Sequence, residues 1–226
     1  MRVKNLHRWD ISARRAVKLQ RGLARMVSSK NEVKKAERIA GVDVSYSPKD
    51  DTMFAGVVVI DVREWRITET AHDVRRVTFP YVPGLLSFRE APAMLGAFRK
   101  LGTVPDVVVV DGQGVAHPRR LGIASHLGLV LDMPTIGCAK SRLCGRHLNV
   151  GPRAGDFANL TDGDEVTGRV LRTRDGVKPV YVSVGHKISL SKACEIILDN
   201  VSIYRLPEAT RAAHAYVTSL RKAGAG

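Results

Sequence analysis

The spacing of apolar residues predicts a helix near the N-terminus, which Ser12 can cap with its hydroxyl group. Apolar side chains three and four residues apart form one face of it: Ala16, Leu19, Leu23 and Met26. Basic side chains at similar spacing form another face: Arg14, Lys18, Arg21 and Arg25. We therefore expect a basic helix at about residues 12–28. Its basic face is either a solvated surface or a surface that faces phosphate groups.

Three strand-like runs follow at residues 38–46, 54–61 and 65–75, joined by short polar segments. Such short connections favour antiparallel pairing, so these runs predict a three-stranded meander. A helix at 87–101 and the run Val107–Val110 come next, and four consecutive valines indicate a strand that is buried on both faces.

A second helix after Pro118 and a strand at 134–139 continue this alternation. A meander followed by alternating helices and strands predicts an α/β fold, with a mixed sheet that carries helices on its faces. The stretch 145–164 is rich in Gly, Asn and Asp and predicts a loop. Asp175-Gly176 then predicts a hairpin between two further strands. The remaining predicted elements are strands at 165–173 and 177–185, and helices at 189–200 and from Glu208 to the C-terminus. No long linker divides the chain, so a single domain over 1–226 is expected.

The net charge of the chain indicates a class of binding partner. The 226 residues include 36 Lys and Arg against 22 Asp and Glu, a formal net charge of +14. The excess is concentrated in residues 1–40, which hold twelve basic and three acidic residues. Such a chain attracts polyanions, so nucleic acid is the first partner to consider and an acidic membrane surface the second.

The chain has three cysteines and neither a CxxC motif nor a Cys/His cluster, so no disulfide framework or structural zinc site is indicated. No stretch approaches the ~18 apolar residues of a membrane span. We expect a cytoplasmic protein that does not enter a membrane.

Two aspartates stand where apolar residues are expected. Asp43 interrupts an apolar strand, and Asp111 directly follows Val107–Val110. A buried carboxylate is costly unless it is paired or binds a metal. If the two strands are parallel neighbours, the carboxylates converge and need a cation between them; oxygen ligands of this kind favour Mg²⁺ or Mn²⁺. The alternative is that either aspartate serves a turn or a cap.

Other candidates are ambiguous from spacing alone. Glu90, expected in the first turn of the helix at 87–101, could add a third carboxylate or merely complement the helix dipole. Four histidines, His117, His126, His186 and His214, could be catalytic, although surface or core positions are more common for histidine.

These residues lie in longer strings that resemble the endonuclease V family. The strings are AGVDV at 40–44, PYVPGLLSFRE at 80–90, DGQG at 111–114, AHPRR at 116–120, GIASH at 122–126, PTIG at 134–137, VSVGH at 182–186 and RLPE at 205–208. Together with Lys140, Arg211 and His214 they extend the resemblance from about residue 10 to about residue 217. Several motifs in the right order make it specific.

The resemblance implies a ribonuclease H-like fold and a Mg²⁺-dependent endonuclease, in which Mn²⁺ substitutes for Mg²⁺. The expected substrate is DNA that contains deoxyinosine, the product of adenine deamination. The expected reaction, which initiates repair, is hydrolysis of the second phosphodiester bond on the 3′ side of the lesion, with a 5′-phosphate left on the product. An inosine-specific ribonuclease and a catalytically silent nucleic-acid-binding protein are the alternatives. We expect the protein to act as a monomer.

The resemblance also implies roles for single residues. Asp43, Glu90 and Asp111 would be metal ligands, and His214 would orient or activate the attacking water. Lys140 would lie near the scissile phosphate, and His117 would be a further active-site residue. Arg89 and Arg119 are expected, with Lys140, to contact the phosphates of DNA.

Base recognition has a physical requirement of its own. Hypoxanthine presents an acceptor at O6 and a donor at N1, and adenine reverses both, so one backbone N–H and one acceptor would reject adenine. Glycine lets backbone approach a base closely, although each glycine could equally serve a turn. The candidates for this base pocket are Gly84, Leu85, Gly112, Gly114 and Gly122.

The extruded base leaves a gap in the stack of bases. By resemblance, the loop Pro80, Tyr81, Val82, Pro83 is the wedge that separates the strands. Its two prolines stiffen it, and Tyr81 supplies a flat face for a neighbouring base. The alternative is that Tyr81 belongs to the core.

Overall fold

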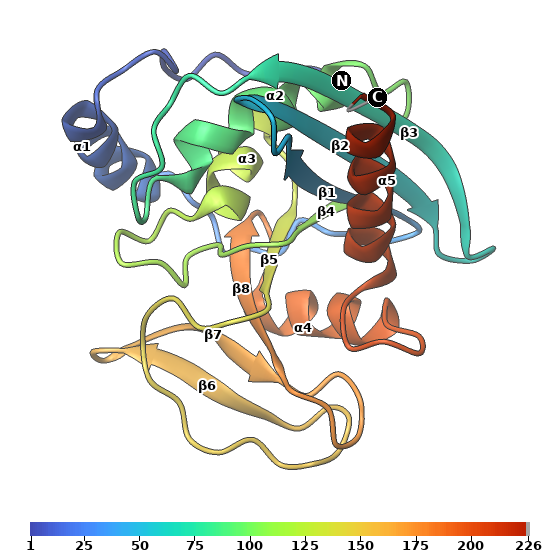
Figure 1. Cartoon of the computed structure of the whole chain (residues 1–226). Helices are drawn as coiled ribbons and strands as arrows, with labels where there is room; N and C mark the ends of the chain where they lie inside the picture. The colour runs from blue at the N-terminus through green and yellow to red at the C-terminus, as the bar shows by residue number, and fades with distance from the viewer. Residues whose placement is uncertain (225–226) are drawn as a thin grey trace.

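One eight-stranded sheet organises the chain, and a computed structural model describes its residues 1–224. The predicted meander is confirmed: β1 (Arg38–Tyr46), β2 (Thr52–Asp61) and β3 (Arg66–Arg76) pair antiparallel in sequence order. The full strand order is β3-β2-β1-β4-β5-β8-β7-β6, so the sheet continues from β1 into the second half of the chain (Figure 1).

The other elements follow the predicted alternation closely. The remaining strands are β4 (Val107–Val110), β5 (Thr135–Ala139), β6 (Phe157–Asp162), β7 (Glu165–Leu171) and β8 (Val180–His186). The helices are α1 (Ala13–Ala24), α2 (Leu86–Arg99), α3 (Ile123–Leu131), α4 (Leu190–Asp199) and α5 (Glu208–Gly224). The last two residues of the helix predicted to reach the C-terminus lie outside the described part of the chain.

The middle of the sheet is parallel. β4 pairs parallel with β1 on one side and with β5 on the other, whereas β8 pairs antiparallel with β5. All four residues of β4 are completely buried, as its run of valines predicts. The carboxyl ends of β4 and β5 therefore open on the same edge of the sheet.

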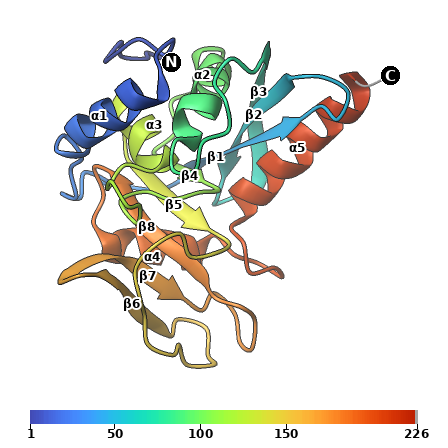
Figure 2. The same cartoon turned by 60° about the vertical axis from the view of Figure 1, so that its left-hand side comes forward.

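Both faces of the sheet are covered. Alternate residues of β1 and β4 belong to two apolar clusters: Ala40 and Val108 pack with α2 and α3, and Ile39 and Val107 pack with α4 and α5. Figure 2 shows α2 and α3 on one side of the strands and α5 on the other. Among the described residues, no helix is both long enough and apolar enough to span a bilayer.

The loop predicted at 145–164 is wrong in its last third, where β6 forms the edge of the sheet. β6 pairs antiparallel with β7 through a tight turn, in which Gly163 adopts φ +62°. Leu160 is buried against Ala116 and Val170. Tertiary packing of one apolar side chain and a glycine turn therefore outweigh the polar composition of this stretch.

The basic helix begins as predicted, because the Ser12 hydroxyl accepts a hydrogen bond from the Arg15 amide. It ends at Ala24, earlier than expected. The cause is tertiary: the Ser28 amide donates to His186 Nδ1, and the Ser28 carbonyl accepts from the Lys187 amide. These two bonds draw the chain out of the helix and onto the end of β8.

Candidate active site

The register of β1 and β4 brings the two aspartates together. Val42 is paired with Val110, so the next residues, Asp43 and Asp111, occupy equivalent positions on neighbouring parallel strands. The negative charge of Asp111 raises the pKa of Asp43, although burial of Asp43 has the larger effect. The convergence that the sequence predicts is therefore present in the fold.

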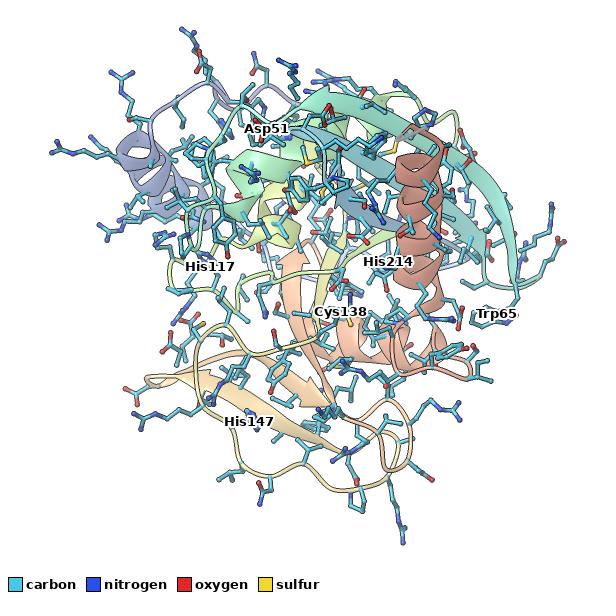
Figure 3. The ribbon with its side chains drawn as sticks, viewed as in Figure 1. Asp51, Trp65, His117, Cys138, His147 and His214 are labelled. Atoms are coloured by element: carbon cyan, nitrogen blue, oxygen red, sulfur yellow. The ribbon has the colours of Figure 1, made fainter. Side chains whose placement is uncertain are left out.

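His214 reaches this place because α5 lies unusually close to β1. A Cβ atom on Gly41 would lie 1.9 Å from the carbonyl oxygen of Ala209, so only glycine permits the approach. Figure 3 shows His214 on α5, five residues beyond Ala209. Its Nδ1 donates to Asp43 Oδ2 over 2.7 Å, which tends to lower the pKa of Asp43. A neutral ring that donates from Nδ1 leaves Nε2 as an acceptor, on a side chain that is 65% exposed.

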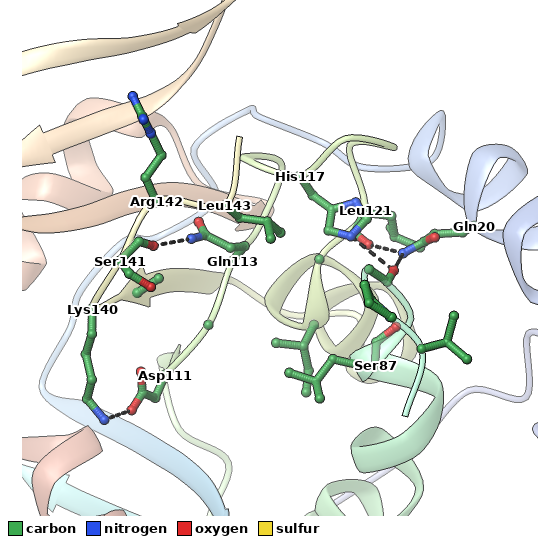
Figure 4. Close-up of a pocket in the computed structure, with 18 of the residues that line it drawn as sticks. Gln20, Ser87, Asp111, Gln113, His117, Leu121, Lys140, Ser141, Arg142 and Leu143 are labelled. Carbon is green, nitrogen blue, oxygen red and sulfur yellow. Dashed lines mark hydrogen bonds and ion pairs between the residues drawn. The ribbon is translucent and has the colours of Figure 1, made fainter. Parts of the chain in front are cut away.

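Lys140 directly follows β5, the third of the parallel strands after β1 and β4. Its ammonium nitrogen lies 2.5 Å from Asp111 Oδ2 (Figure 4). The Lys140 side chain is 45% exposed, whereas that of Asp111 is 20% exposed. An exposed cation thus faces a largely buried carboxylate.

Glu90 approaches from α2, on the opposite face of the sheet from α5. It lies beyond the first turn of α2 and is only 8% exposed, so complementing the helix dipole does not explain it. The Tyr46 hydroxyl donates to Glu90 Oε1 over 2.8 Å. Burial, together with the charges of Asp43 and Asp111, raises the pKa of Glu90 to about 7 despite that hydrogen bond.

These three carboxylates repel one another and suit a hard cation by their chemistry. Within residues 1–224, however, no group of three or more acidic, His or Cys side chains is gathered closely enough to hold a metal ion. Each carboxylate has another partner: His214 for Asp43, Lys140 for Asp111 and Tyr46 for Glu90. Lys140 occupies the position of a counter-ion beside Asp111, and the chemistry of the three carboxylates, though not their present spacing, fits a hard divalent ion.

A cavity of about 370 Å³ opens beside Asp111 and Lys140 (Figure 4). Its walls include part of the predicted wedge, Tyr81, Val82 and Pro83, and the predicted pocket glycines Gly84, Gly112 and Gly122. Tyr81 is 72% exposed, which argues against a core role. Charged groups, a wedge-like loop and a glycine-lined hollow therefore share one cavity.

Not every predicted pocket residue lines this cavity. Leu85 is buried in a cluster with Ala16 and Phe88. Gly114 instead allows close packing on β8, because a Cβ there would lie 2.0 Å from the Val184 carbonyl oxygen. Pro80, which was predicted as part of the wedge, also lies outside the cavity wall, at the exposed start of its loop.

The carbonyl oxygen of Gly84 fixes the wedge loop to the cavity. It accepts hydrogen bonds from Gln20 Nε2 at 3.0 Å, His117 Nε2 at 3.1 Å and Arg119 Nη2 at 2.7 Å. Gly84 has φ +76°, and a Cβ there would lie 2.5 Å from Arg119. The positive φ favours glycine at this position, whereas the Arg119 guanidinium lies at the end of a flexible side chain that can move away from a Cβ.

His117 is neutral in this arrangement. Its Nε2–H donates to Gly84, and its Nδ1 accepts from the Arg119 amide over 3.1 Å. Burial, and then the charge of Arg119, lowers the pKa of His117 to about 4. With both nitrogens engaged, His117 holds the cavity wall rather than offering a free acid or base.

The two arginines predicted to contact phosphate also make internal bonds. Arg119 is tied to Gly84 and Gln20. Arg89 donates to the Phe79 carbonyl oxygen over 2.7 Å, and its guanidinium lies 5.1 Å from the centre of the Tyr46 ring. Arg89 therefore connects the base of the wedge loop to the tyrosine that contacts Glu90.

Sequence reasoning missed several residues of the cavity wall. They are Gln20, Leu86, Ser87, Gln113, Leu121, Ile123, Ala139, Ser141, Arg142 and Leu143. Ser87 and Gln113 lie inside strings that the sequence marks as important, so their position beside Glu90 and Asp111 was an available signal. Gln20 belongs to the N-terminal helix, and nothing in its local pattern distinguishes it from other polar helix residues.

A mixed sheet that carries Asp43 and Asp111 at equivalent positions on neighbouring parallel strands, next to a cavity and a lysine, is typical of a nuclease of the ribonuclease H-like class. Comparison with known proteins makes the assignment specific. A sequence model of the family described as Endonuclease V matches residues 21–215. The chain belongs to the Endonuclease V family, a family of metal-dependent nucleases.

Relatives support this over nearly the whole chain. An Endonuclease V from Myxococcus xanthus is 49% identical over 217 residues, covering 96% of this chain and 92% of its own. One from Dehalococcoides mccartyi is 46% identical over 220 residues, covering 97% and 99%. The predicted family and class of enzyme, a nuclease that hydrolyses DNA, are confirmed.

Solved structures agree. The crystal structure of Endonuclease V from Streptomyces avermitilis superposes with a TM-score of 0.92 at 39% identity and covers both chains completely. A Ciona intestinalis Endonuclease V in complex with a 23mer DNA, which contains an inosine followed by a ribo-adenosine, superposes with a TM-score of 0.82. It is 25% identical and covers 94% of this chain and 99% of its own. The predicted ribonuclease H-like fold is confirmed.

Proposed function

We propose that this protein is a Mg²⁺-dependent endonuclease that recognises inosine in DNA and hydrolyses the second phosphodiester bond on its 3′ side. The observation that carries the proposal is the shared cavity: Tyr81, Gly84, Asp111 and Lys140 line one hollow of about 370 Å³. An extruded base and a reacting phosphate a short distance along the same strand can occupy such a hollow together. The inosine-containing DNA bound by the Ciona relative supports this substrate.

Asp43, Glu90 and Asp111 would hold the metal ion. When bound, the ion would neutralise charge on the phosphoryl oxygens and lower the pKa of a water molecule. Carboxylate oxygens are hard ligands, which supports Mg²⁺, with Mn²⁺ as a substitute. Glu90 ionises more readily beside a cation, because the cation offsets the burial that now raises its pKa.

Two side chains would act on the phosphate and the nucleophile. Asp43 orients the His214 ring so that Nε2 is free to accept a proton from the attacking water. Lys140, released from Asp111, would place its positive charge beside the developing negative charge of the phosphate. His117, Arg119 and Arg89 would position the cavity wall and the wedge loop, as their internal bonds indicate.

The wedge loop would fill the place of the extruded base. Tyr81 is exposed on a loop that ends in the fixed carbonyl of Gly84, so its ring can stack on a neighbouring base without reorganising the core. Removing a base from the stack costs a few kcal/mol, and least at a mismatch. This cost favours lesions that already pair poorly.

Ribonuclease activity on inosine-containing RNA is the second candidate. The Ciona relative binds DNA in which a ribonucleotide follows the inosine. Contacts to a 2′-hydroxyl distinguish RNA from DNA at a given position. A comparison of matched DNA and RNA substrates therefore decides between the two activities.

The test uses four 5′-labelled oligonucleotides, DNA and RNA, each with inosine or adenine at one position. Products are resolved at single-nucleotide length in Mg²⁺ and in EDTA. We expect Mg²⁺-dependent cutting of inosine DNA one nucleotide beyond the inosine. Cutting in EDTA would reject the metal mechanism, cutting of RNA alone would favour the ribonuclease, and binding without cutting would favour a silent protein.

A further inference from the structure

A basic surface begins next to Lys140 and follows residues 141–153, which belong to the connection between β5 and β6. We call these residues the basic segment. It contains Arg142, Arg146 and Arg153 and no acidic residue, and all three arginines are exposed. Figure 1 shows the connection beside β6, the outer strand of the sheet. The motifs of the family resemblance do not include the basic segment, so the resemblance assigns it no role.

The backbone of the basic segment is fixed at two places. The Arg146 amide donates to the Thr161 carbonyl oxygen over 2.6 Å, and the Arg146 carbonyl oxygen accepts from the Thr161 amide over 2.8 Å. Further along, the Arg172 guanidinium donates to the carbonyl oxygens of Gly151 and Val150 over 2.8 Å and 3.1 Å. The arginines of the basic segment are therefore attached to an ordered backbone.

Acidic side chains next to the far end of the basic segment are occupied by its own backbone. Asp156 Oδ2 accepts from the Arg153 amide over 2.8 Å. Asp175 Oδ1 accepts from the Ala154 amide over 2.6 Å. These carboxylates fix the course of the chain and leave the Arg153 guanidinium without an acidic partner.

The acidic residue beside Arg146 is also occupied. Asp162 and Arg146 line one shallow hollow, but Asp162 Oδ2 lies 2.9 Å from Arg120 Nη1. Arg120 pairs with Glu165 as well, over 2.7 Å. Within residues 1–224, none of the three arginines of the basic segment forms an ion pair. Their charges thus remain available to an anion in solution.

The basic segment starts on a particular side of the cavity. Figure 4 shows Lys140 and Arg142 on one side, opposite His117 and Gln20. His117 and Gln20 both donate to the carbonyl oxygen of Gly84, at the end of the wedge loop. Lys140 and Arg142 extend in opposite directions in this view. The surface beyond Lys140 therefore leads away from the wedge loop and toward the basic segment.

We infer that the basic segment binds the phosphates of the DNA strand beyond the cut, on the 3′ side of the lesion. This inference rests on the proposed function, which places the lesion beside the wedge loop and the reacting phosphate beside Lys140. A strand that continues in the 3′ direction past Lys140 meets the basic segment next. Unpaired guanidinium groups suit this partner, because each can bond two phosphate oxygens and release condensed counterions.

Shortening the DNA tests this site. Affinities are measured, with Ca²⁺ in place of Mg²⁺, for two inosine duplexes that share a 5′ flank. One duplex has a long 3′ flank, and the other ends a few base pairs beyond the cut. We expect truncation to weaken wild-type binding about tenfold or more, because several phosphate contacts are lost. A variant with Arg146→Gln and Arg153→Gln should lose less than about twofold on truncation, because it no longer makes those contacts.

Arg63→Gln combined with Arg99→Gln is the matched control. It removes the same charge at exposed positions in the β2–β3 turn and at the end of α2. This control should lose as much affinity on truncation as wild type. Truncation of the 5′ flank should affect all three proteins equally.

The outcomes separate the inference from the function on which it rests. Equal losses on 3′ truncation for wild type and the Arg146→Gln, Arg153→Gln variant overturn the inference alone, as does a wild type that is indifferent to the 3′ flank. A wild type that does not prefer the inosine duplex to a matched adenine duplex overturns the proposed function and the inference together.

Neutral phosphates test the same contacts in the wild-type protein, without any substitution in the chain. A methylphosphonate linkage replaces one charged phosphate at a time beyond the cut. We expect several-fold weaker binding at adjacent positions on the 3′ side, and no such effect in the Arg146→Gln, Arg153→Gln variant. Wild-type binding that is insensitive to every neutral linkage on this side would show that the basic segment is a solvated surface.

Discussion

Asp43 and Asp111 stand side by side because their strands are parallel and in register. Replacing either aspartate with alanine should lower the cleavage rate at least about 100-fold, because the proposed metal loses a ligand. Binding of inosine DNA in Ca²⁺ should remain measurable. Gel-resolved cleavage assays check this, with Asp50→Ala as the control, since Asp50 is an exposed acidic residue in the β1–β2 turn. Full activity in either variant would contradict the ligand assignment.

His117 should make stability depend on pH. Its pKa is about 4 in the folded protein and about 6.5 when unfolded, so between these values the unfolded chain binds the extra proton. The contribution of neutral His117 to the free energy of unfolding is complete above pH 6.5. It is lost as pH falls toward 4, at roughly 1 kcal/mol per pH unit.

Urea unfolding in EDTA at pH 7, 6 and 5 measures this effect. His117→Gln, which can still donate to Gly84, should lose less stability on acidification than wild type. The raised pKa of Glu90 changes stability with pH in the opposite direction, but this effect is common to both proteins. His72→Gln, at an exposed position on β3, is the control for the substitution. Parallel pH profiles for wild type and His117→Gln would contradict the account.

Part of the site could be predicted from single residues. Asp43 and Asp111 interrupt apolar runs, and a carboxylate buried in such a position is costly unless it is paired or binds a metal. Glu90 and His214 gave no such local signal, because their approach to the two aspartates depends on how α2 and α5 pack on the sheet. The resemblance to a family supplied both.

At the scale of elements, the position of α5 depends on one glycine. Gly41→Ala would bring Cβ to 1.9 Å from the Ala209 carbonyl oxygen, and backbone cannot yield as a flexible side chain can. We expect a loss of about 1–3 kcal/mol in unfolding free energy and a lower cleavage rate, because His214 moves away from Asp43.

Gly22→Ala is the matched control for this substitution. It lies inside α1, where a Cβ meets nothing within 4 Å, and should stabilise the protein by about 0.5–1 kcal/mol. Chemical denaturation and steady-state cleavage measure both variants. A Gly41→Ala protein as stable and active as wild type would contradict the close approach of α5.

The wedge loop should affect selection rather than folding. Tyr81→Ala removes an exposed ring, so the unfolding free energy should change by less than about 0.5 kcal/mol. Discrimination between inosine and adenine DNA should fall clearly, because no side chain then fills the place of the extruded base. Tyr204→Ala, at a ring that is 52% exposed in the loop before α5, is the control. A lower melting temperature with unchanged discrimination would identify Tyr81 as a structural residue.

Elements were easier to predict than their packing. The spacing of apolar residues located the meander, the buried β4 and the cap of α1, since each depends on local pattern. β6 was missed, because its single buried leucine and its pairing with β7 depend on contacts distant from its own composition. The close approach of α5 to β1 could not be predicted either, since an isolated Gly41 gives no indication of which backbone will meet it.

For the whole molecule, the charge of +14 should make binding depend on salt. Arg14, Lys18, Arg21 and Arg25 line a shallow hollow on α1, the helix whose Gln20 also reaches the cavity. Replacing Arg14, Lys18 and Arg21 with Gln should reduce the slope of log affinity against log salt by about 0.9 for each DNA phosphate that the variant no longer neutralises.

Fluorescence anisotropy with inosine DNA over a range of salt concentrations measures this slope. The control replaces Arg221 and Lys222, in the last turn of α5, with Gln. Equal slopes for wild type and the α1 variant would show that this basic face is a solvated surface.

Distant acidic residues would meet at one metal site beside a cavity for a deaminated base. The most direct measurement is anomalous diffraction from crystals of the protein bound to inosine DNA and soaked in Mn²⁺. We expect a Mn²⁺ peak within bonding distance of Asp43, Glu90 and Asp111, with the inosine base in the cavity lined by Gly84 and Tyr81. A Mn²⁺ peak away from these carboxylates in an active complex, or an inosine that remains stacked in the duplex, would contradict it.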